Sequence, residues 1–340
     1  MTARYLGVDG GGSKTAFALI DDAGRVLARA TAPTSYYFST AAGAESATRF
    51  DGVERVLAQG VNEICAQAGI APEDIDRAFF GLPGYGEASA DVAALDAVPA
   101  KVLGHDRYGC DNDMVCGWAG SLAGEDGINV ISGTGSMTYG ERRGTGHRVG
   151  GWGELFGDEG SAYWVAAHGL NAFSRMSDGR MPRGPLYDLL RQRLGITSDL
   201  DAVSLVIDTW GGARGAIAAL ATTVCEAAAA GDAAADGILV DAAAELATLI
   251  DTTATLVGFT AAETVPVSYS GGMFSDSGFL QRFRVALDAL PAAIDLRRPL
   301  LDPAIGAALY AAKQSGHPLS ADAVQQLAAA ATKSEKVTSP

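Results

Sequence analysis

The stretch GVDGGGSKT, residues Gly7–Thr15, places three consecutive glycines and a lysine directly after a short apolar run. Glycine lets the backbone come close to an anion and present successive N–H groups to it, so this stretch predicts a phosphate-binding loop. Apolar runs lie on both sides, YLGV before the loop and TAFALI after it, and turn residues separate them. They predict consecutive antiparallel strands over residues 1–30.

Other interpretations of this loop explain less of it. A Walker A loop, GxxxxGK[ST], needs glycine where Ser13 stands. Both a Walker A loop and a Rossmann turn need a following helix, whereas TAFALI has the pattern of a strand. A plain hairpin turn needs only one or two glycines with positive φ, and it leaves Asp9 unexplained.

The composition is that of a globular protein with room for two domains. The chain has 340 residues, of which 48% are hydrophobic and 19% are charged. No apolar run approaches the roughly 18 residues of a membrane span, and the first residues lack the apolar core of a signal peptide, so we expect a cytoplasmic protein without a membrane partner. The formal charge of −15 disfavours nucleic-acid binding. A nucleotide would therefore have to be held by backbone amides, dipoles and Mg²⁺.

The remaining pattern alternates between helix and strand. Helical periodicity over residues 45–69 precedes the apolar run RAFFGL and a strand-like stretch that ends near Asp113. The segment GINVISGTGSMTYGERRG then repeats the opening theme, and alanine-rich segments over 213–230 and 233–257 predict helices. We predict an α/β fold with an N-terminal domain over 1–118, a C-terminal domain with helical additions over 119–332, and a disordered tail over 333–340.

Two further loops also place glycines after a strand. Gly133-Thr134-Gly135-Ser136 follows NVIS, and the pair Gly271-Gly272 follows PVSYS. Either loop alone is compatible with a tight turn, but paired glycines also let a flat purine and its ribose lie against the backbone. Three such loops in one acidic chain favour a nucleotide site.

The segment Gly150–Ser161, GGWGELFGDEGS, combines an aromatic ring with carboxylates on a glycine-rich loop. The ring of Trp152 suits the C–H face of a sugar, and the Asp158 carboxylate suits a sugar hydroxyl. The alternative is a packed tryptophan and an aspartate that caps the helix SAYWVAAHGL.

These motifs together resemble a known family. GVDGGGSKT, the pair Asn112-Asp113, ISGTGS, GGWGELFGDEGSAYW and the late SGG are similar to the N-acetylglucosamine kinases and BadF-type ATPases of the actin, Hsp70 and hexokinase superfold, over roughly residues 4–312. The most selective element is GGWGxxxGDEGS. The resemblance implies two actin-like (ribonuclease H-like) domains around an ATP cleft, Mg²⁺, and an ATP-dependent kinase that phosphorylates an amino sugar, N-acetylglucosamine or glucosamine, at its 6-hydroxyl.

The same resemblance implies roles for individual residues. Asp113 would be the catalytic base, and Asp9 would hold a metal-bound water. The residues implied at the phosphates are Gly11, Gly12, Ser13, Lys14, Thr15, Thr134, Gly135 and Ser136; at the adenosine, Gly271 and Gly272; and at the sugar, Ser35, Asn112, Asp113, Gly151, Trp152 and Asp158. An alternative for Asp113 is a cap of the helix that begins near Met114, with Asp111 in reserve as the base.

Two departures from the family pattern leave the acceptor open. Met137 follows GTGS where N-acetylglucosamine kinases carry asparagine, and Thr34-Ser35-Tyr36-Tyr37 stands where they carry an asparagine in the early sugar loop. Tyr36 and Tyr37 either stack on the substrate or pack against the following helix.

Other functions fit the residues less well. An ATPase that activates a partner reductase or dehydratase through an iron–sulfur cluster needs a cysteine pair at a subunit interface, and Cys110 and Cys116 flank the expected base instead. A transcriptional regulator needs a helix-turn-helix before the first strand, and a chaperone needs a peptide-binding domain after the core. We expect ATP and an amino sugar as partners, with a homodimer implied by relatives.

Overall fold

The computed structural model describes residues 2–37 and 46–338, and the chain forms two compact units. Unit 1 combines the residues up to Glu125 with those from Arg298 onward, and unit 2 spans Asp126–Arg297. These limits differ from the predicted boundaries after residues 118 and 332, because the segment from Arg298 returns to the N-terminal sheet. There the helix α11 (Pro303–Gln314) approaches strand β1 (Arg4–Gly10) so closely that any side chain at Gly7 would overlap the backbone of Ala304.

Unit 1 is built on a five-stranded sheet whose order is β3-β2-β1-β4-β5. Strands β1, β2 (Lys14–Asp21) and β3 (Val26–Pro33) are antiparallel neighbours, as predicted, while β4 (Arg77–Leu82) and β5 (Tyr108–Asn112) run parallel to β1. The parallel strands therefore end at one edge of the sheet, which brings the residues that follow β1 and β5 to the same edge.

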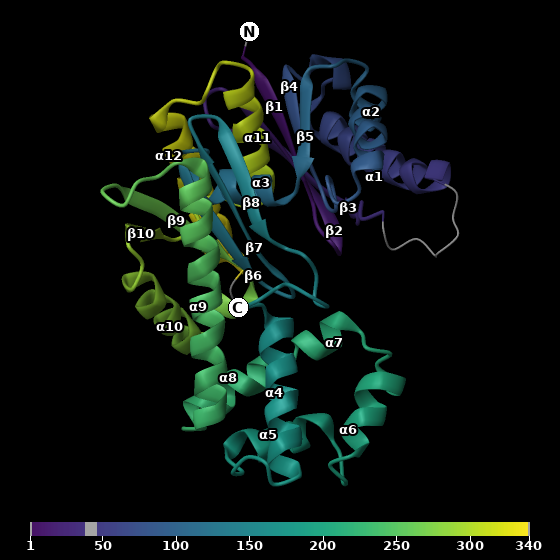
Figure 1. Cartoon of the computed structure of the whole chain (residues 1–340). Coiled ribbons are helices and arrows are strands. Elements are labelled where there is room, and N and C mark those ends of the chain that lie inside the picture. Colours follow the sequence, from purple (N-terminus) through teal and green to yellow (C-terminus); the bar gives the residue numbers. More distant parts are fainter. Residues whose placement is uncertain (1, 38–45, 339–340) are drawn as a thin grey trace. The chain divides into compact units, whose positions relative to one another are not determined.

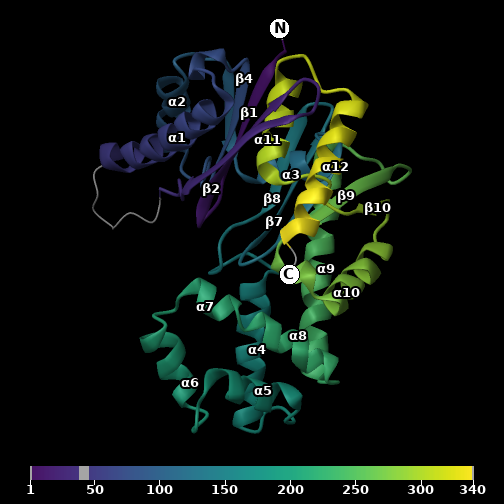
Figure 2. The ribbon, with the colours of Figure 1, turned by 180° about the vertical axis from the view of Figure 1, so that it is seen from behind.

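Helices cover both faces of this sheet (Figures 1 and 2). On one face lie α1 (Ser46–Ala68) and α2 (Val92–Leu103), and on the other α3 (Met114–Leu122) and α11. Buried residues of α1, spaced along one side of the helix, pack on the sheet: Val53, Leu57, Val61 and Ile64. The helix α12 (Ala321–Thr338) continues through most of the segment predicted as a tail, and residues 339–340 lie outside the described residues. Short 3-10 turns occur at Pro72–Asp74 and Ser89–Asp91.

Unit 2 repeats the topology of unit 1. Its sheet has the order β10-β9-β6-β7-β8, formed by β6 (Gly127–Ser132), β7 (Ser136–Arg142), β8 (Thr145–Gly150), β9 (Thr264–Ser270) and β10 (Ala293–Arg297). The first three strands are antiparallel, and β9 is parallel to both β6 and β10. The repeat inferred from GINVISGTGSMTYGERRG is thus a repeat of the whole sheet.

Helices make up most of the remainder of unit 2. In Figures 1 and 2, α4 (Ala162–Ser177), α5 (Pro185–Leu194), α6 (Asp201–Ser204), α7 (Arg214–Ala218) and α8 (Ala221–Ala229) gather at one end of the sheet. The long α9 (Ala233–Val257) packs on β6, β7 and β8, and α10 (Ser277–Asp288) packs on α9. A π-helical segment, Leu205–Thr209, follows α6, and a 3-10 turn, Gly272–Ser275, follows β9. The alanine-rich segment 213–230 is two helices instead of one.

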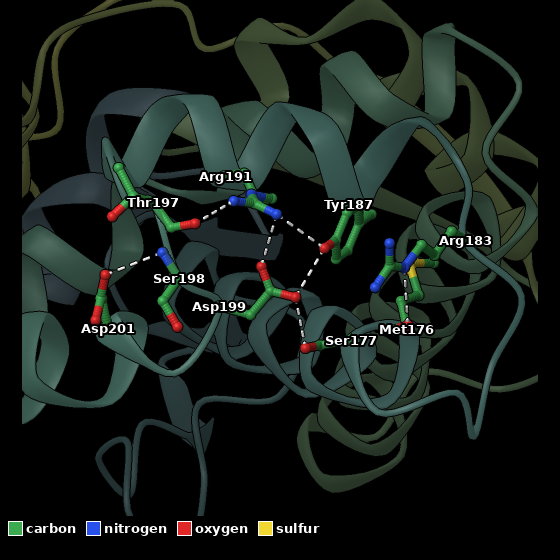
Figure 3. A network of polar contacts seen from close by, with 9 residues as sticks. All are labelled: Met176, Ser177, Arg183, Tyr187, Arg191, Thr197, Ser198, Asp199 and Asp201. Atoms are coloured by element: carbon green, nitrogen blue, oxygen red, sulfur yellow. Dashed lines mark hydrogen bonds and ion pairs between the residues drawn. The ribbon is translucent and has the colours of Figure 1, made fainter.

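A polar network holds the helical additions of unit 2 together (Figure 3). The Asp199 carboxylate accepts hydrogen bonds from Ser177 Oγ at 2.6 Å and from Tyr187 Oη at 2.7 Å, and its other oxygen lies 3.0 Å from Arg191 Nη1. The hydrogen bonds from Ser177 and Tyr187 hold the pKa of Asp199 below its ordinary value. This one side chain connects α4, α5 and the turn before α6. Nowhere in residues 2–37 and 46–338 is a helix both long and apolar enough to span a bilayer.

Candidate functional site

The first glycine loop closes on itself at the end of β1. Gly11 N donates a hydrogen bond to Lys14 O at 2.8 Å, and Thr34 Oγ1 donates to Gly11 O at 2.8 Å. The tip of the loop, residues 12–14, is exposed. The loop therefore presents its backbone and the Lys14 ammonium outward, as an anion site requires.

Thr15 and Ser35 support this loop from within the unit. Both are buried, and Thr15 Oγ1 donates a hydrogen bond to Ser35 Oγ at 3.1 Å. Tyr37 is also buried: its ring packs 5.7 Å from that of Phe50 in α1, and its hydroxyl lies 3.4 Å from Gly84 O. Of the two alternatives for Tyr37, packing against the following helix is the one the structure shows.

Two aspartates predicted for the site meet at the edge where the parallel strands end. Asp9 lies on β1 opposite Gly81 of β4, and Asp113 directly follows β5. Gly81 permits this approach, because a Cβ there would lie 3.0 Å from the Cα of Asp113 and would overlap Cys116 Sγ. Burial first, and then the charges of Asp113 and Asp302, raise the pKa of Asp9 to about 7, although Lys14 opposes the rise.

Asp302 was not found from the sequence. It caps α11 by accepting a hydrogen bond from Ile305 N at 3.0 Å, and it pairs with Arg29 at 2.8 Å. In the sequence, Asp302 stands directly before Pro303, at the start of a helix. That pattern predicts a helix cap and indicates no role at the site.

The capping alternative for Asp113 finds no support in the geometry. Within the described part of the chain, the Asp113 side chain makes no capping hydrogen bond to α3. The neighbouring Asn112 caps α3 instead, because its Oδ1 accepts a hydrogen bond from Met114 N at 3.2 Å. Its Nδ2 donates a hydrogen bond to Tyr85 O, also at 3.2 Å. Asn112, predicted at the sugar, is buried and its amide has structural partners. Asp111 accepts a hydrogen bond from Asn112 N at 2.7 Å.

In unit 2, the second glycine loop is joined to the loop that precedes α4. Gly133 N donates to Gly135 O at 2.9 Å, and Gly133 O accepts from Ala162 N at 2.8 Å. Ser136 Oγ donates to Glu159 O at 2.6 Å, and Ser136 is buried. The Ser136 hydroxyl thus supports the loop, whereas Thr134 is exposed at its tip.

Asp158 lies beneath this second loop. It is buried and adopts a φ of 58°, which is unusual for a residue other than glycine and points to a constrained position. Its carboxylate accepts hydrogen bonds from the backbone of Ser136 and Gly153 and is bonded to the guanidinium of Arg214. Burial raises the pKa of Asp158, and Arg214 opposes the rise. The helix cap of α4 is Ser161, which accepts from Trp164 N at 3.1 Å, so the capping alternative for Asp158 was wrong.

Arg214 was also missed by the sequence analysis. It begins α7, and besides Asp158 it contacts Glu154, whose Oε2 lies 3.3 Å from Arg214 Nε. A lone arginine at the start of an alanine-rich segment carries no motif, so no local pattern indicated it.

The aromatic loop is strongly exposed. Trp152 is 71% exposed, Leu155 86% and Phe156 75%, so Trp152 is not a packed core residue. At the root of this loop, Gly151 touches Met137, because a Cβ on Gly151 would lie 2.8 Å from Met137 Cε. The methionine that departs from the family pattern therefore lies against the loop predicted to bind the sugar.

A cavity of about 740 Å³ opens beside the second glycine loop, within unit 2. Its walls come from the loop itself, from α7 and α8, and from the turn after β9, and include Thr134, Gly215, Ala219, Thr222, Glu226 and Gly272. The volume is that of a site for a drug-sized ligand. Gly271, with a φ of 104°, is held against the backbone of Ser132, whereas a Cβ on Gly272 meets nothing within 4 Å.

Comparison with known proteins places these features in a family. The model of the BadF/BadG/BcrA/BcrD ATPase family matches residues 6–311. The chain belongs to this family. An N-acetyl-D-glucosamine kinase of Dictyostelium discoideum is 30% identical over 312 residues, which are 90% of this chain and 97% of that protein. An N-acetylmuramic acid/N-acetylglucosamine kinase of Clostridium acetobutylicum is 27% identical over 308 residues, again 90% of this chain and 97% of that protein.

Solved structures agree with the family assignment at the level of the fold. A Chromobacterium violaceum protein, provisionally named an N-acetylglucosamine kinase, superposes with a TM-score of 0.64 at 23% identity, over 91% of this chain and 99% of that one. The predicted α/β, actin-like fold of this BadF/BadG/BcrA/BcrD family member is thereby confirmed.

Proposed function

We propose that the protein is an ATP-dependent kinase of an amino sugar, with N-acetylglucosamine or glucosamine as the acceptor at the 6-hydroxyl. The observation that carries the proposal is the cavity of about 740 Å³ that opens on Thr134 of the second glycine loop, in the unit that also holds Trp152 and Asp158. The curated relatives named as kinases of N-acetylglucosamine support the same choice.

The cavity suits an adenosine better than a phosphate chain. Among the described residues, those that line it include Glu226 and Asp276 and no lysine or arginine. Carboxylates repel phosphates, but they accept hydrogen bonds from ribose hydroxyls and from an exocyclic amine. We place the adenosine there, against Gly272, and the phosphates toward Thr134 and Gly135.

In unit 1, we propose residues 11–14 as a phosphate loop and Asp9 as the residue that would hold a metal-bound water. The negative charges of Asp113 and Asp302 oppose the ionisation of Asp9. A hard cation near Asp9 would offset this repulsion, so the position suits one. Among residues 2–37 and 46–338, no cluster of three or more metal-ligating side chains occurs. Protein sites often hold Mg²⁺ through one or two carboxylates together with water and phosphate oxygens. When bound, Mg²⁺ would neutralise charge on the phosphates.

Asp113 would orient the acceptor and take its proton. The sugar O6 forms a bond to the γ-phosphorus, the bond from that phosphorus to the β–γ bridging oxygen breaks, and the hydroxyl proton passes to the Asp113 carboxylate. ADP and the sugar 6-phosphate leave. Because phosphoryl transfer has a loose transition state, orientation contributes more than early deprotonation.

The acceptor would contact the loop that carries Trp152 and Asp158. The exposed indole offers a face for the C–H groups of a sugar. The Asp158 carboxylate is buried and bonded to Arg214 in the absence of ligand, and we propose that it accepts a hydrogen bond from a sugar hydroxyl when the acceptor binds. Met137 cannot donate the hydrogen bond that an asparagine would give to an acyl oxygen. We therefore expect glucosamine to match or exceed N-acetylglucosamine as a substrate.

A coupled assay of ADP release across a panel of sugars tests this function. The panel should include glucosamine, N-acetylglucosamine, N-acetylmuramic acid, glucose and a no-sugar control. We expect the highest kcat/KM with an amino sugar and little release without sugar. Release that is independent of every sugar would refute the kinase and favour an ATPase.

The alternative, an activator ATPase with a shared iron–sulfur cluster, is opposed by the cysteines. Cys116 is fully buried with its thiol 3.5 Å from Val8 O, and burial raises the pKa of both Cys116 and Cys110. Cluster ligands are exposed thiolates at an interface, so these thiols are poor candidates. Iron analysis of the purified protein checks the point.

A further inference from the structure

The guanidinium of Arg214 lies against the backbone of the second glycine loop, residues 133–136. If Gly135 carried a Cβ, that atom would overlap Arg214 Nη2 and would lie 2.7 Å from Asp158 Oδ2. Arg214 also immediately precedes Gly215, which lines the cavity assigned to the adenosine. The guanidinium thus lies where the nucleotide cavity meets the loop assigned to the phosphates.

The guanidinium is held on one side and open on the other. Asp158, buried and bonded to the backbone of Ser136 and Gly153, binds Nη2, and Glu154 lies 3.3 Å from Nε. The Arg214 side chain is nevertheless 41% exposed. An arginine that is oriented by a buried carboxylate and partly open to solvent is well placed to bind a further anion, because its planar fork has five N–H donors.

The charges around the cavity in unit 2 favour such a group. In the part of the chain that the structure describes, the residues that line the cavity include Glu226 and Asp276 and no lysine or arginine, and the whole chain has a formal charge of −15. A triphosphate that enters this field needs a positive partner near its β- and γ-phosphates.

We propose that Arg214 binds the β- or γ-phosphate of the nucleotide at the loop of residues 133–136 and neutralises charge there during transfer. This inference rests on the proposed function, because it takes the cavity to be the nucleotide site. Arg214 stays protonated throughout and exchanges no proton with the substrate. Asp158 acts on it as a positioning residue.

Nucleotide binding without sugar tests the assignment. Titration calorimetry with AMP, ADP and the non-hydrolysable ATP analogue AMPPNP, each with Mg²⁺, separates phosphate contacts from nucleoside contacts. In Arg214→Met we expect AMPPNP affinity to fall by about 10- to 100-fold, the usual loss for a charge-assisted hydrogen bond, and AMP affinity to change less than about twofold. Arg180→Met, an exposed arginine of the same unit, is the matched control.

A second variant distinguishes phosphate binding from support of Asp158. Arg214→Gln keeps an N–H donor for the Asp158 carboxylate but loses the charge. If Arg214 binds phosphate, we expect Arg214→Gln to bind AMPPNP as weakly as Arg214→Met does. Recovery of AMPPNP affinity in Arg214→Gln, or an equal loss for AMP and AMPPNP in either variant, overturns the inference. If no adenine nucleotide binds the unaltered protein, the proposed function itself fails.

Discussion

Replacing Asp9 by asparagine is expected to stabilise the protein at neutral pH while abolishing its activity. In the folded protein the pKa of Asp9 is about 7, against an ordinary value of 3.8, chiefly because of burial and of the charges of Asp113 and Asp302. Each tenfold change in proton affinity corresponds to about 1.4 kcal/mol, so the difference amounts to at most about 4 kcal/mol, and we expect about 2 to 4 kcal/mol.

The sign of the pH dependence follows from the raised pKa. Below about pH 4, Asp9 is protonated in both the folded and the unfolded chain, and the substitution changes little. As the pH rises toward 7, the unfolded chain releases the proton while the folded protein retains it, so the wild-type protein loses stability relative to Asp9→Asn. Above pH 7 the difference is constant.

Denaturant unfolding of both proteins at pH 5 and pH 8, without nucleotide or metal, measures this difference. Asp51→Asn, on the exposed side of α1, is the control and should show no such pH dependence. Added Mg²⁺ with ATP should stabilise the wild-type protein more than Asp9→Asn. If Asp9→Asn is no more stable than the wild type at pH 8, then Asp9 is not crowded by charge and its assignment to the cation is refuted.

Four further substitutions test other parts of the site. In Gly272→Val the new side chain meets no protein atom but projects from the cavity wall, so the KM for ATP should rise far more than that for sugar, and equal rises would point to misfolding. Asp113→Asn should lower kcat by about 10² to 10⁴ without loss of stability, because it removes a charge that opposes the ionisation of Asp9. Asp111→Asn is its control, and loss of kcat only in Asp111→Asn would move the base to Asp111. Asp158→Ala should lower kcat/KM for the sugar by about 10- to 150-fold, and unchanged kinetics would make the loop structural. Asp199→Asn should reduce the free energy of unfolding by about 1 to 3 kcal/mol at neutral pH, because the lowered pKa of Asp199 stabilises the fold there. The loss should be smaller near pH 3, and equal losses at both pH values would contradict this account.

Local patterns were sufficient for the strands on either side of each glycine loop, but not for the edge strand β10 or for the order of either sheet. The antiparallel strands around the first glycine loop follow from turn residues between apolar runs, and the repeat in the second half follows from the same pattern. The domain boundary depends instead on a contact between β1 and α11, residues that are far apart in the chain. Gly7 marks that contact, but a glycine in a strand only indicates that some backbone comes close, not which one.

Side-chain roles could be predicted only where the partners were adjacent in sequence. Asn112 and Ser136 are polar residues in the expected motifs, yet each is buried with its side chain bonded to nearby backbone. Residue type and spacing indicate that a polar group is present, but not whether it faces the ligand or the interior, because that depends on the conformation of the loop. Thr134, two residues before Ser136, is the exposed member of the loop.

The surroundings of the first glycine loop were easier to infer from the sequence than those of the second. In unit 1, the half-buried acid Asp9 and the cation Lys14 flank the glycines within one nine-residue motif, Gly7–Thr15. In unit 2, the same strand-loop-strand topology takes its buried acid from Asp158 and its cation from Arg214, both far along the chain from residues 133–136. Each loop then pairs one cation with an aspartate whose pKa is raised by burial. Such pairing balances charge around each loop when no nucleotide is bound, and it leaves a cation in place when phosphate arrives. A strongly acidic protein can bind a triphosphate in this way without a basic surface, which is why the net charge disfavours nucleic acids but leaves nucleotides open.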